Sequence, residues 1–566
     1  MDRVNRTSDS DEIVRLEALP TELLSRIVGA TDWEDVLRLR QTSLRMREVS
    51  YDRDVWKEVF LRYLGTRIPR PFYLPKPLHA CSSEDIEHAI ISWEAPWPEY
   101  IPAKLTIHRI DWKSQILHPA IYNHGRFGRP YILNRSLCLI PGGRWLLFIL
   151  KFDASLWYFD LSEAGHRDLR PRLLCAEMSI PGNLVKVGYM AVDLISAQLS
   201  SPGTYHLTEF NVAIAAPQCV RQVNSAEWHT RITVCSIEVV FEPDVGDGSA
   251  VATKAVGLRV SRYLSRYIDK FPSPSSLSFF CLLGGEVAYK VEMRSETDPE
   301  DQSYAVIVEW KDANGNTSGE DLLRRYIPVP SLQHGVLLPE SRILVTTLAE
   351  KSPNLMLYRW RDVAIPSMHP LQGKLFENAT PSWQGRVDLN FSFPDSLWYM
   401  SGDIRLVTDT VKEGVYGIRV LSSEDQLQKS SETVLGKDIV SVEQLAKAIP
   451  GQGGSIKILA GQWEGATCQY HRRYHYDARL HKSTASHYSW LNSPPSNTLS
   501  TSVMDYGPPM SLLPNDGRYD LASDSVVPGG VILQPIFDEL SGRSIFNAGE
   551  VNEFLITVDL NLPFLK

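Results

Sequence analysis

The chain lacks any apolar run long enough to cross a membrane as a helix, although it contains 566 residues. A membrane-spanning helix needs about 20 consecutive apolar residues, whereas runs here, such as Leu146–Leu150, are far shorter. The first ten residues are almost entirely polar and do not resemble a secretory signal peptide. We therefore expect a cytoplasmic or nuclear protein, or one found in both compartments, without membrane attachment.

Cysteine is scarce, and basic residues do not predominate. The seven cysteines show no paired spacing of the kind that marks a disulfide framework or a structural zinc site. We therefore expect reduced thiols. The formal net charge of -9 and the isoelectric point near 5.9 lack the basic excess of a general nucleic-acid binder. The composition thus predicts no nucleic-acid partner.

The sequence also lacks the short motifs of common enzyme classes. It contains no Gly-x-Ser-x-Gly nucleophile elbow and no Gly-x-x-x-x-Gly-Lys-Ser/Thr phosphate loop. The glycine-rich run at 451–454 has no flanking strand and helix, and the acidic run at 298–301 is typical of a solvated turn. We predict no catalytic residues and no cofactor.

Four histidines between positions 471 and 487 raise a metal hypothesis. His471 and His475 would share one face of a helix and could bind zinc there. The tyrosine-rich segment around them is instead typical of a strand, on which four residues span about 13 Å, too far for one ion. We expect no metal. The segment is either an ordinary solvated strand or a weak candidate for substrate contact, through His471, Arg472, Arg473 and Tyr474.

Three helices are predicted near the start of the chain. Leu23 and Ile27 recur at the spacing of one helix face after Pro20, whose missing N–H costs nothing in a first turn. Asp32 and Asp52 stand where the N-caps of a second and a third helix are expected. So small a unit has little interior of its own, and its surplus of apolar residues favours a partner groove.

This stretch resembles the F-box, the helical module that joins substrate receptors to Skp-cullin ubiquitin ligases. It contains Leu-Pro-Thr-Glu-Leu-Leu at 19–24, Asp-Val-Leu-Arg-Leu at 35–39 and Asp-Val-Trp-Lys at 54–57, in the family's order and spacing. Thr31 and Met46 depart from the family pattern, which usually has a leucine and commonly an aromatic residue there. The alternative is a three-helix cap packed on the following domain.

The resemblance implies that this module binds the Skp adaptor and, through it, cullin. The residues that it assigns to adaptor binding are Leu19, Pro20, Leu23, Leu24, Ile27, Val36, Leu37, Leu39, Val55 and Trp56.

From about residue 103 the chain changes to short apolar strands separated by Gly, Pro, Asn and Asp. Aromatic strand ends recur near Phe159, Phe210, Trp310 and Trp360, at intervals of about 50 residues or twice that, and 257–261 fills the gap. Further candidates for the same repeat are 414–420, 469–474 and 554–559. A strand, a turn and an aromatic strand at this period are typical of a β-propeller blade.

We therefore predict a large all-β domain, most simply a β-propeller of about seven blades, with six or eight as close alternatives. The Gly-His…Trp-Asp signature of WD repeats is absent. A pair of β-sandwiches is the competing architecture. The longer irregular stretches at 421–455 and 483–528 are predicted as loops or insertions.

These observations divide the chain into a disordered N-terminus (1–15), an F-box (16–65), a proline-rich linker with a short helix (66–102) and a propeller-like substrate-recognition domain (103–566). The resemblance implies a non-catalytic substrate receptor of a Skp-cullin-F-box ligase that captures an unidentified protein substrate. One alternative is a propeller enzyme or ligand-binding propeller whose helices are only a cap. Another is an F-box protein that works outside a ligase.

Overall fold

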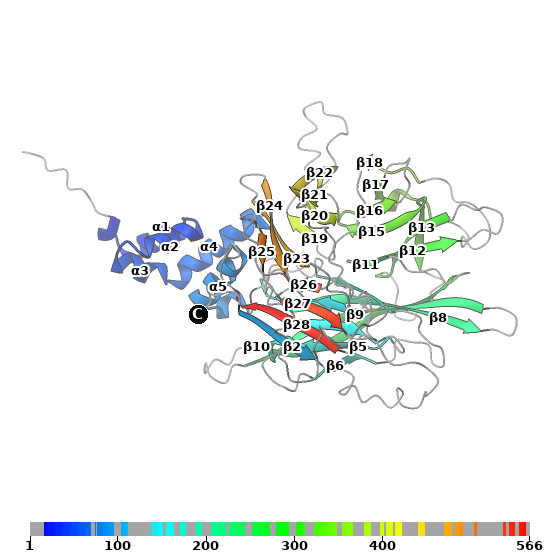
Figure 1. Ribbon diagram of the computed structural model, residues 1–566, viewed down its shortest axis with the longest axis horizontal. Coiled ribbons are helices and arrows are strands. Elements are labelled where there is room, and N and C mark those ends of the chain that lie inside the picture. The colour runs from blue at the N-terminus through cyan, green and yellow to red at the C-terminus, as the bar shows by residue number, and fades with distance from the viewer. Residues whose placement is uncertain are drawn as a thin grey trace, which may run out of the picture.

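The computed structural model describes the chain in separate stretches between residues 16 and 561. These stretches are 16–68, 74, 76–94, 104–110, 137–140, 142–150, 154–163, 170–176, 188–194, 205–221, 226–243, 252–271, 279–293, 302–311, 322–347, 354–365, 379–385, 397–400, 403–410, 414–421, 440–447, 469–477, 482–490, 503–505, 536–538, 543–548 and 554–561. The predicted disorder of residues 1–15 lies outside them. The helices gather at one side of a large β region (Figure 1).

The first part of the chain forms four α-helices after one short 3-10 turn. Their bounds are η1 (Leu16–Ala18), α1 (Thr21–Gly29), α2 (Trp33–Leu39), α3 (Leu44–Ser50) and α4 (Arg53–Thr66). The prediction of three helices was therefore wrong, because it missed α3. This helix of seven residues buries Met46, Val49 and Ser50, too few positions to set an apolar period.

Polar residues mark where the later helices begin. Ser43 caps α3, since its Oγ accepts a hydrogen bond of 3.2 Å from the Met46 N–H. Asp52 lies just before α4 and accepts a bond of 3.0 Å from the Asp54 N–H. Asp32 occupies the N-cap position of α2 without a side-chain capping bond. The cap residues Asp32 and Asp52 thus lie at helix starts, as predicted.

A fifth helix packs on the first four. It follows η2 (Leu78–Ala80) and spans α5 (Ser83–Glu94), and Ser82 caps it by accepting a bond of 3.1 Å from the Asp85 N–H. Ile86 and Ile90 of α5 enter the same buried cluster as Trp56 and Phe60 of α4. We call the set of helices α1–α5 with this shared core the helical module.

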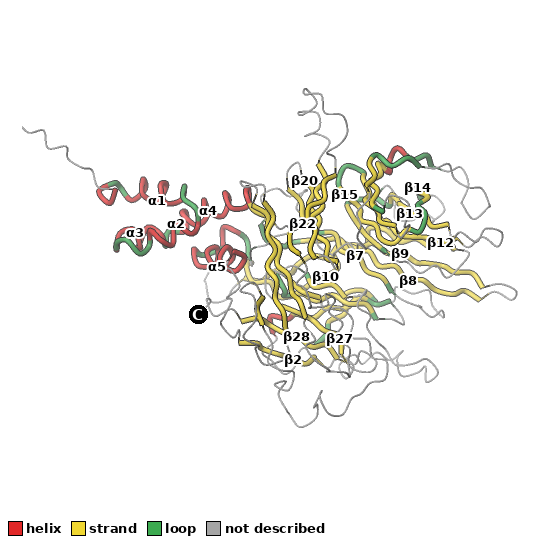
Figure 2. Tube along the Cα trace, turned by 45° about the horizontal axis from the view of Figure 1, so that its top comes forward, coloured by secondary structure: helices red, strands yellow, loops and turns green. Residues whose placement is uncertain are grey.

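The β region consists of seven four-stranded sheets within the described residues. In spatial order, the first three sheets contain β3 (Leu137–Leu139), β4 (Trp145–Ile149), β5 (Leu156–Asp160) and β6 (Arg172–Cys175); β7 (Tyr189–Asp193), β8 (Glu209–Arg221), β9 (Ala226–Pro243) and β10 (Ala252–Phe271); and β11 (Phe280–Leu283), β12 (Glu286–Met293), β13 (Gln302–Glu309) and β14 (Leu323–Pro328). The fourth and fifth sheets contain β15 (Leu332–Leu338), β16 (Arg342–Thr347), β17 (Leu355–Arg359) and β18 (Trp383–Gly385); and β19 (Leu397–Met400), β20 (Asp403–Thr410), β21 (Gly414–Leu421) and β22 (Val440–Lys447). The last two sheets combine strands from distant parts of the sequence: β1 (Arg67–Ile68), β23 (Gln469–Asp477), β24 (Lys482–Trp490) and β25 (Val503–Asp505); and β2 (Lys104–Ile110), β28 (Phe554–Asn561), β27 (Arg543–Ala548) and β26 (Ile536–Asp538). Figure 2 shows how strands dominate this region.

The sheets are antiparallel apart from the pair β24 and β25. Buried clusters join each of the first four sheets to the next, so the core of these five sheets lies between them. Strand β2 pairs with β28, which lies more than 400 residues later in the sequence, with Lys104 opposite Asn561 and Ile110 opposite Leu555. Strand β26, in the same sheet as β2, contacts β3 of the first sheet. The all-β prediction is thus confirmed at the level of four-stranded sheets.

The repeat read from the sequence matches these sheets only in part. Phe159 lies on β5, whereas Trp310 and Trp360 directly follow β13 and β17; each of these three strands is the third along the chain in its sheet. Phe210 lies on a second strand instead, and 257–261 lies on a fourth. The reason is length: β8, β9 and β10 contain 13, 18 and 20 residues, so this sheet stretches the period.

Two predicted loops contain strands. Strand β22 (Val440–Lys447) falls inside 421–455, and β24 (Lys482–Trp490) falls largely inside 483–528, as β25 does entirely. Their alternation is weak, because each mixes small, polar and charged residues. Among the described helices, none is both long and apolar enough to span a membrane.

Candidate docking surface

The residues predicted to bind an adaptor fall into three groups in the helical module. Leu24, Val36, Val55 and Trp56 are buried in its core. Leu19, Leu37 and Leu39 are half-buried against that core, whereas Pro20, Leu23 and Ile27 are exposed. The first two groups can shape a surface, and only the third offers its side chains freely to a partner.

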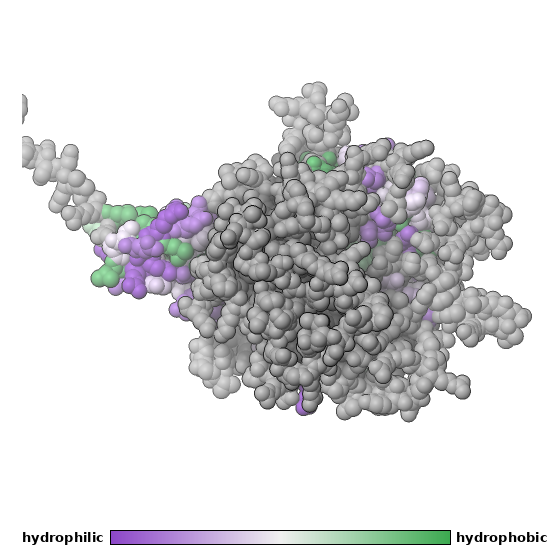
Figure 3. Space-filling model, viewed as in Figure 1, coloured by the Kyte–Doolittle hydropathy of each residue, from purple (hydrophilic) through white to green (hydrophobic). Residues whose placement is uncertain are grey.

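Exposed apolar side chains concentrate on α1, α3 and their neighbours. Leu23 and Ile27 lie one helical turn apart on α1, with 46% and 41% of their surface exposed. Leu44, the first residue of α3, is 78% exposed. Leu16 and Tyr51 are also exposed. We call these five residues the docking surface, and Figure 3 shows apolar colour on the helical module.

The apolar pattern of the sequence did not indicate Leu16, Leu44 and Tyr51 as contact residues. Leu44 directly follows the Ser43 cap, a position where a helix has no preceding turn to cover its side chain. The polar neighbours Arg45 and Arg47 hid it from a search for apolar periodicity. A cap followed by an isolated leucine was the available signal.

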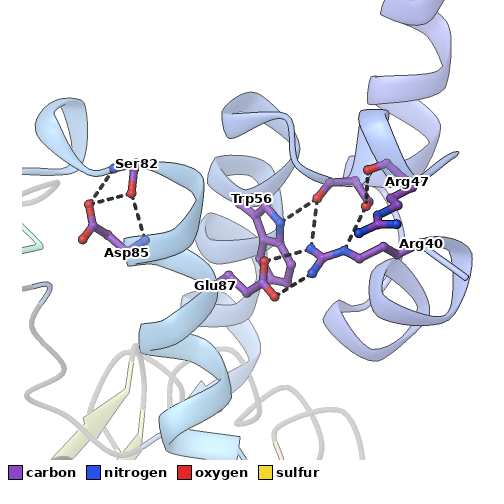
Figure 4. A network of polar contacts seen from close by, with 7 residues as sticks. Arg40, Arg47, Trp56, Ser82, Asp85 and Glu87 are labelled. Carbon is purple, nitrogen blue, oxygen red and sulfur yellow. Dashed lines mark hydrogen bonds and ion pairs between the residues drawn. The ribbon is translucent and has the colours of Figure 1, made fainter. Parts of the chain in front are cut away.

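A half-buried ion pair holds α5 against the other helices of the module (Figure 4). Arg40 donates two hydrogen bonds to the Glu87 carboxylate, at 2.9 and 2.8 Å, and both side chains are 16% exposed. A paired geometry of this kind satisfies both oxygens and fixes orientation. Arg40 also donates to Ser50 Oγ at 3.0 Å, and the Trp56 indole N–H donates to the Ser50 carbonyl at 2.8 Å. The end of α3 is thereby tied to α4 and α5.

The electrostatics of Arg40 suit this role. Burial opposes its charge, but the hydrogen bonds and the negative charge of Glu87 outweigh burial, so the pKa of Arg40 is raised. The guanidinium also lies over the ring of Tyr51, 4.1 Å from its centroid. One face of Tyr51 is therefore fixed by a half-buried cation while the ring stays 43% exposed.

Arginines also satisfy backbone carbonyls at the helix ends. Arg62 donates to the carbonyls of Gly29 and, at 2.8 Å, Thr31, where α1 has ended. Arg45 donates to the Leu19 carbonyl at 2.5 Å, which ties α3 to the start of α1. Carbonyls at helix ends and turns have no helical partner, so these contacts rigidify the base of the docking surface.

The helical module also contacts the β region directly. The Leu74 N–H donates to the Tyr205 carbonyl at 2.5 Å, and the Tyr205 ring meets Phe60 edge to face at 5.5 Å. Tyr205, which lies between β7 and β8, packs against the core of the module. The neighbouring His206 is half-buried and meets the Phe241 ring edge to face, and partial burial, with His79, lowers its pKa. We call this contact the junction.

The weak candidates for substrate contact lie in the β region. His471, Arg472, Arg473 and Tyr474 belong to strand β23, as their strand prediction required. Their side chains lie outside what the structure describes. Across the described ranges, no group of three or more His, Cys, Asp or Glu residues could hold a metal ion.

The strongest buried charges of the β region serve packing between sheets. Asp269 of β10 accepts bonds from Tyr289 and, at 3.0 Å to Nε, from Arg324, both in the next sheet. Asp269 raises the pKa of Arg324 against the effect of burial. Every member of this group is held by another, and the arrangement joins two sheets instead of facing a reacting substrate.

Comparison with known proteins gives one family match. The F-box-like family model matches residues 16–62, which run from η1 into α4. No curated protein matches the chain.

Among solved structures, the chain is similar to the apo prolyl oligopeptidase B from Galerina marginata, at 10% identity and a TM-score of 0.29, over 79% of this chain and 54% of that one. It is also similar to a puromycin-hydrolyzing peptidase of Mycobacterium tuberculosis, at 12% identity and a TM-score of 0.20, over 62% and 50%. The chain thus spans about half the length of these proteins.

Proposed function

The chain is an F-box protein through its residues 16–62, and on this basis we propose that it is a non-catalytic substrate receptor of a Skp-cullin-F-box ubiquitin ligase. The helical module binds the Skp adaptor, which connects it to cullin. The β region binds a protein substrate and brings it close to the ubiquitin-loaded enzyme, which raises the effective concentration of the two reactants. This activity belongs in the cytoplasm, the nucleus or both.

The observation that carries the proposal is the docking surface. Soluble proteins seldom keep clustered apolar side chains in water without a partner for them. Leu23, Ile27 and Leu44 extend from a base that the Arg40–Glu87 pair and the buried Trp56 hold in place. A pre-organised base lowers the entropy lost on binding, and exposed leucines are suited to a helix-in-groove contact.

In this proposal the ten predicted residues divide the work. Pro20, Leu23 and Ile27 touch the adaptor. Leu19, Leu24, Val36, Leu37, Leu39, Val55 and Trp56 set the shape of the surface through packing. Leu16, Leu44 and Tyr51 join the contact set because they are exposed just before α1 and at the two ends of α3, which contacts α1.

We further propose that the β region is a seven-bladed propeller that recognises the substrate. Seven four-stranded sheets, clusters packed between successive sheets, and the pairing of β2 with β28 all support this architecture. A propeller of this kind presents a broad face made of loops and strand ends, which suits capture of a protein. The boundaries that we propose are 16–65 for the F-box, 66–102 for the connection and 103–566 for the propeller.

The test is co-purification of the Skp adaptor with a chain carrying Leu23→Asp and Ile27→Asp. Both side chains are exposed, so the module should stay folded while recovered adaptor falls at least about 10-fold, as for loss of an interface hot spot. Leu173→Asp is the matched control, because Leu173 is 44% exposed but lies on β6. It should retain the adaptor.

Full recovery of the adaptor by the folded double variant would overturn the docking proposal. Loss of ubiquitin conjugation on proteins bound to the β region, with those proteins still recovered, separates the receptor role from mere binding. Retained adaptor binding without any cullin in the complex would instead favour an F-box protein that works outside a ligase.

A further inference from the structure

Two cysteines from neighbouring sheets meet inside the β region. Cys175 ends β6 of the first sheet, and Cys235 lies within β9 of the second. Their Sγ atoms are 3.9 Å apart, and the side chains are 1% and 0% exposed. They belong to one apolar cluster between the sheets. Two thiols in van der Waals contact are placed for oxidation to a disulfide, which removes two electrons from the pair.

The two thiols have different surroundings. The hydrogen bond from Cys235 lowers the pKa of Cys175 despite burial, and the Tyr263 hydroxyl and the charge of Arg266 act in the same direction. The same hydrogen bond and burial raise the pKa of Cys235. Cys175 is therefore the better nucleophile, because thiolate rather than thiol reacts with peroxides, and Cys235 remains a thiol beside it.

A side chain that reaches the surface contacts Cys175. Tyr263, whose hydroxyl bonds the Cys175 sulfur, is 52% exposed on the edge strand β10. Arg266 is exposed as well and lies over the Tyr263 ring, 5.2 Å from its centroid. The buried Cys175 thiol is thus one hydrogen bond away from an exposed side chain.

We propose that Cys175 and Cys235 form a redox-modification site that a hydroperoxide converts to a disulfide, a property that goes beyond the proposed ligase function. The Cys175 thiolate attacks one peroxide oxygen and breaks the O–O bond, which gives a sulfenic acid and releases water or an alcohol after proton uptake. The Cys235 sulfur then attacks the sulfenic sulfur and displaces water. Two thiols lose two electrons and two protons, and one further equivalent of water leaves.

The bond would link the outer strand of one sheet to an inner strand of the next. A disulfide has an S–S length of about 2.05 Å, so side-chain rotation must bring the sulfurs together from contact distance. The closed loop contains residues 60 positions apart. Cross-linking a loop of this length restricts the unfolded chain, so oxidation stabilises the β region.

Two other thiols serve as matched controls. Burial raises the pKa of Cys81 to about 11 and that of Cys281 to about 12. Each sulfur contacts a backbone carbonyl, of Lys76 and of Ala288. Both are poor nucleophiles at neutral pH, and they should react with peroxide much more slowly than Cys175.

The experiment treats the full chain with hydrogen peroxide, blocks remaining thiols by alkylation and maps the unreduced peptides by mass spectrometry. We expect one peptide pair joined through Cys175 and Cys235, and a midpoint temperature of unfolding raised by about 4 °C, reversed by dithiothreitol. Cys81→Ser and Cys281→Ser should leave the cross-link unchanged. In Cys235→Ser, Cys175 should stop at the sulfenic acid and be trapped by dimedone.

Absence of the joined pair in the oxidised wild-type protein would overturn the proposal, whatever the variants do. So would alkylation of Cys175 no faster than that of Cys281. Cys235→Ala provides a second test if the serine variant does not fold. Because none of these readouts involves the Skp adaptor, the redox site and the ligase function can fail separately.

Discussion

The helical module and the β region differ in how many large apolar side chains they leave exposed. Five large apolar side chains of the module stay exposed, although it is by far the smaller region: Leu16, Leu23, Ile27, Leu44 and Tyr51. Among the β-region side chains that the structure describes, the exposed large apolar ones are Leu173, Tyr263 and Leu323, on three different sheets, and Ile365. The module is thus incomplete without a partner, whereas the β region completes its core by sheet-on-sheet packing.

The ion pairs of the two regions also differ in what they hold together. The Arg40–Glu87 pair of the module joins helices around the docking surface. In the β region, Arg324 and Asp269 join neighbouring sheets, and Arg144 bonds Asp160 on its own sheet and the Ala255 carbonyl on the next. One region uses an ion pair to hold a surface in shape, and the other uses ion pairs to align its repeats.

The strongest test of this contrast is Asp269→Ala. The change leaves Arg324, which is 10% exposed, without its carboxylate between two sheets. Removing one partner of a buried pair costs about 3–5 kcal/mol, so the unfolding midpoint of the β region in urea should drop strongly. Glu238→Ala removes the exposed partner of Arg259 and should cost less than about 1 kcal/mol. Equal losses for both variants would contradict the role given to Asp269.

Glu87→Ala tests the corresponding pair of the helical module. Arg40 would keep its bonds to Ser50 and lose its charged partner, at a cost of about 2 kcal/mol. The module should unfold at lower urea concentration and bind the Skp adaptor less tightly, as measured by titration calorimetry. Asp35→Ala removes an exposed pair with Arg38 and should change neither quantity measurably.

Acid should affect Asp160 through its ion pair. Burial alone would raise its pKa, but hydrogen bonds from Arg144 and Ser162 outweigh burial and lower it. The bonds therefore contribute stability above about pH 4, where the unfolded side chain is ionised, and this stability is lost as pH falls through the lower folded pKa. Asp160→Asn should cost about 1–2 kcal/mol at pH 7 and progressively less as the pH falls below about 4 toward the folded pKa, measured by chemical denaturation across pH. A cost independent of pH would contradict this.

The smallest expected change in stability belongs to Leu44→Ser. This side chain is 78% exposed, so the free energy of unfolding should change by less than about 0.5 kcal/mol. Affinity for the adaptor should nevertheless fall, in the same calorimetric assay. Leu323→Ser, at a leucine of β14 that is 43% exposed, should change neither. An unchanged adaptor affinity for Leu44→Ser would remove it from the docking surface.

Local signals in the sequence predicted much of the helical module. The spacing of Leu23 and Ile27 after Pro20 predicted a helix where α1 lies. The same spacing could not distinguish exposed Leu23 from buried Leu24, because neighbouring residues of an amphipathic helix differ only in which element covers them. Tyr205 was beyond reach for the same reason: its packing on Phe60 is a contact between distant parts of the sequence.

For the β region, the sequence predicted the architecture but not the lengths and contacts of individual strands. Aromatic strand ends at regular intervals predicted all-β architecture, because each sheet needs large residues at its interface with the next. The interval failed where strands β8–β10 lengthen, since strand length follows from pairing partners and not from local propensity. Side-chain contacts of the thiol pair were equally invisible, as Cys175 and Cys235 approach only when two sheets stack.

The pairing of β2 with β28 has a consequence for biosynthesis. Residues 104–110 leave the ribosome long before their partner strand at 554–561 has been made. Throughout that interval β2 lacks its hydrogen-bonding neighbour, and an open strand edge invites chaperones or other chains. A prematurely terminated polypeptide keeps this edge permanently, so translation errors in the second half of the message remain recognisable at the first strand of the sheet. The edge of β2 is therefore covered only when residues 554–561 have been synthesised.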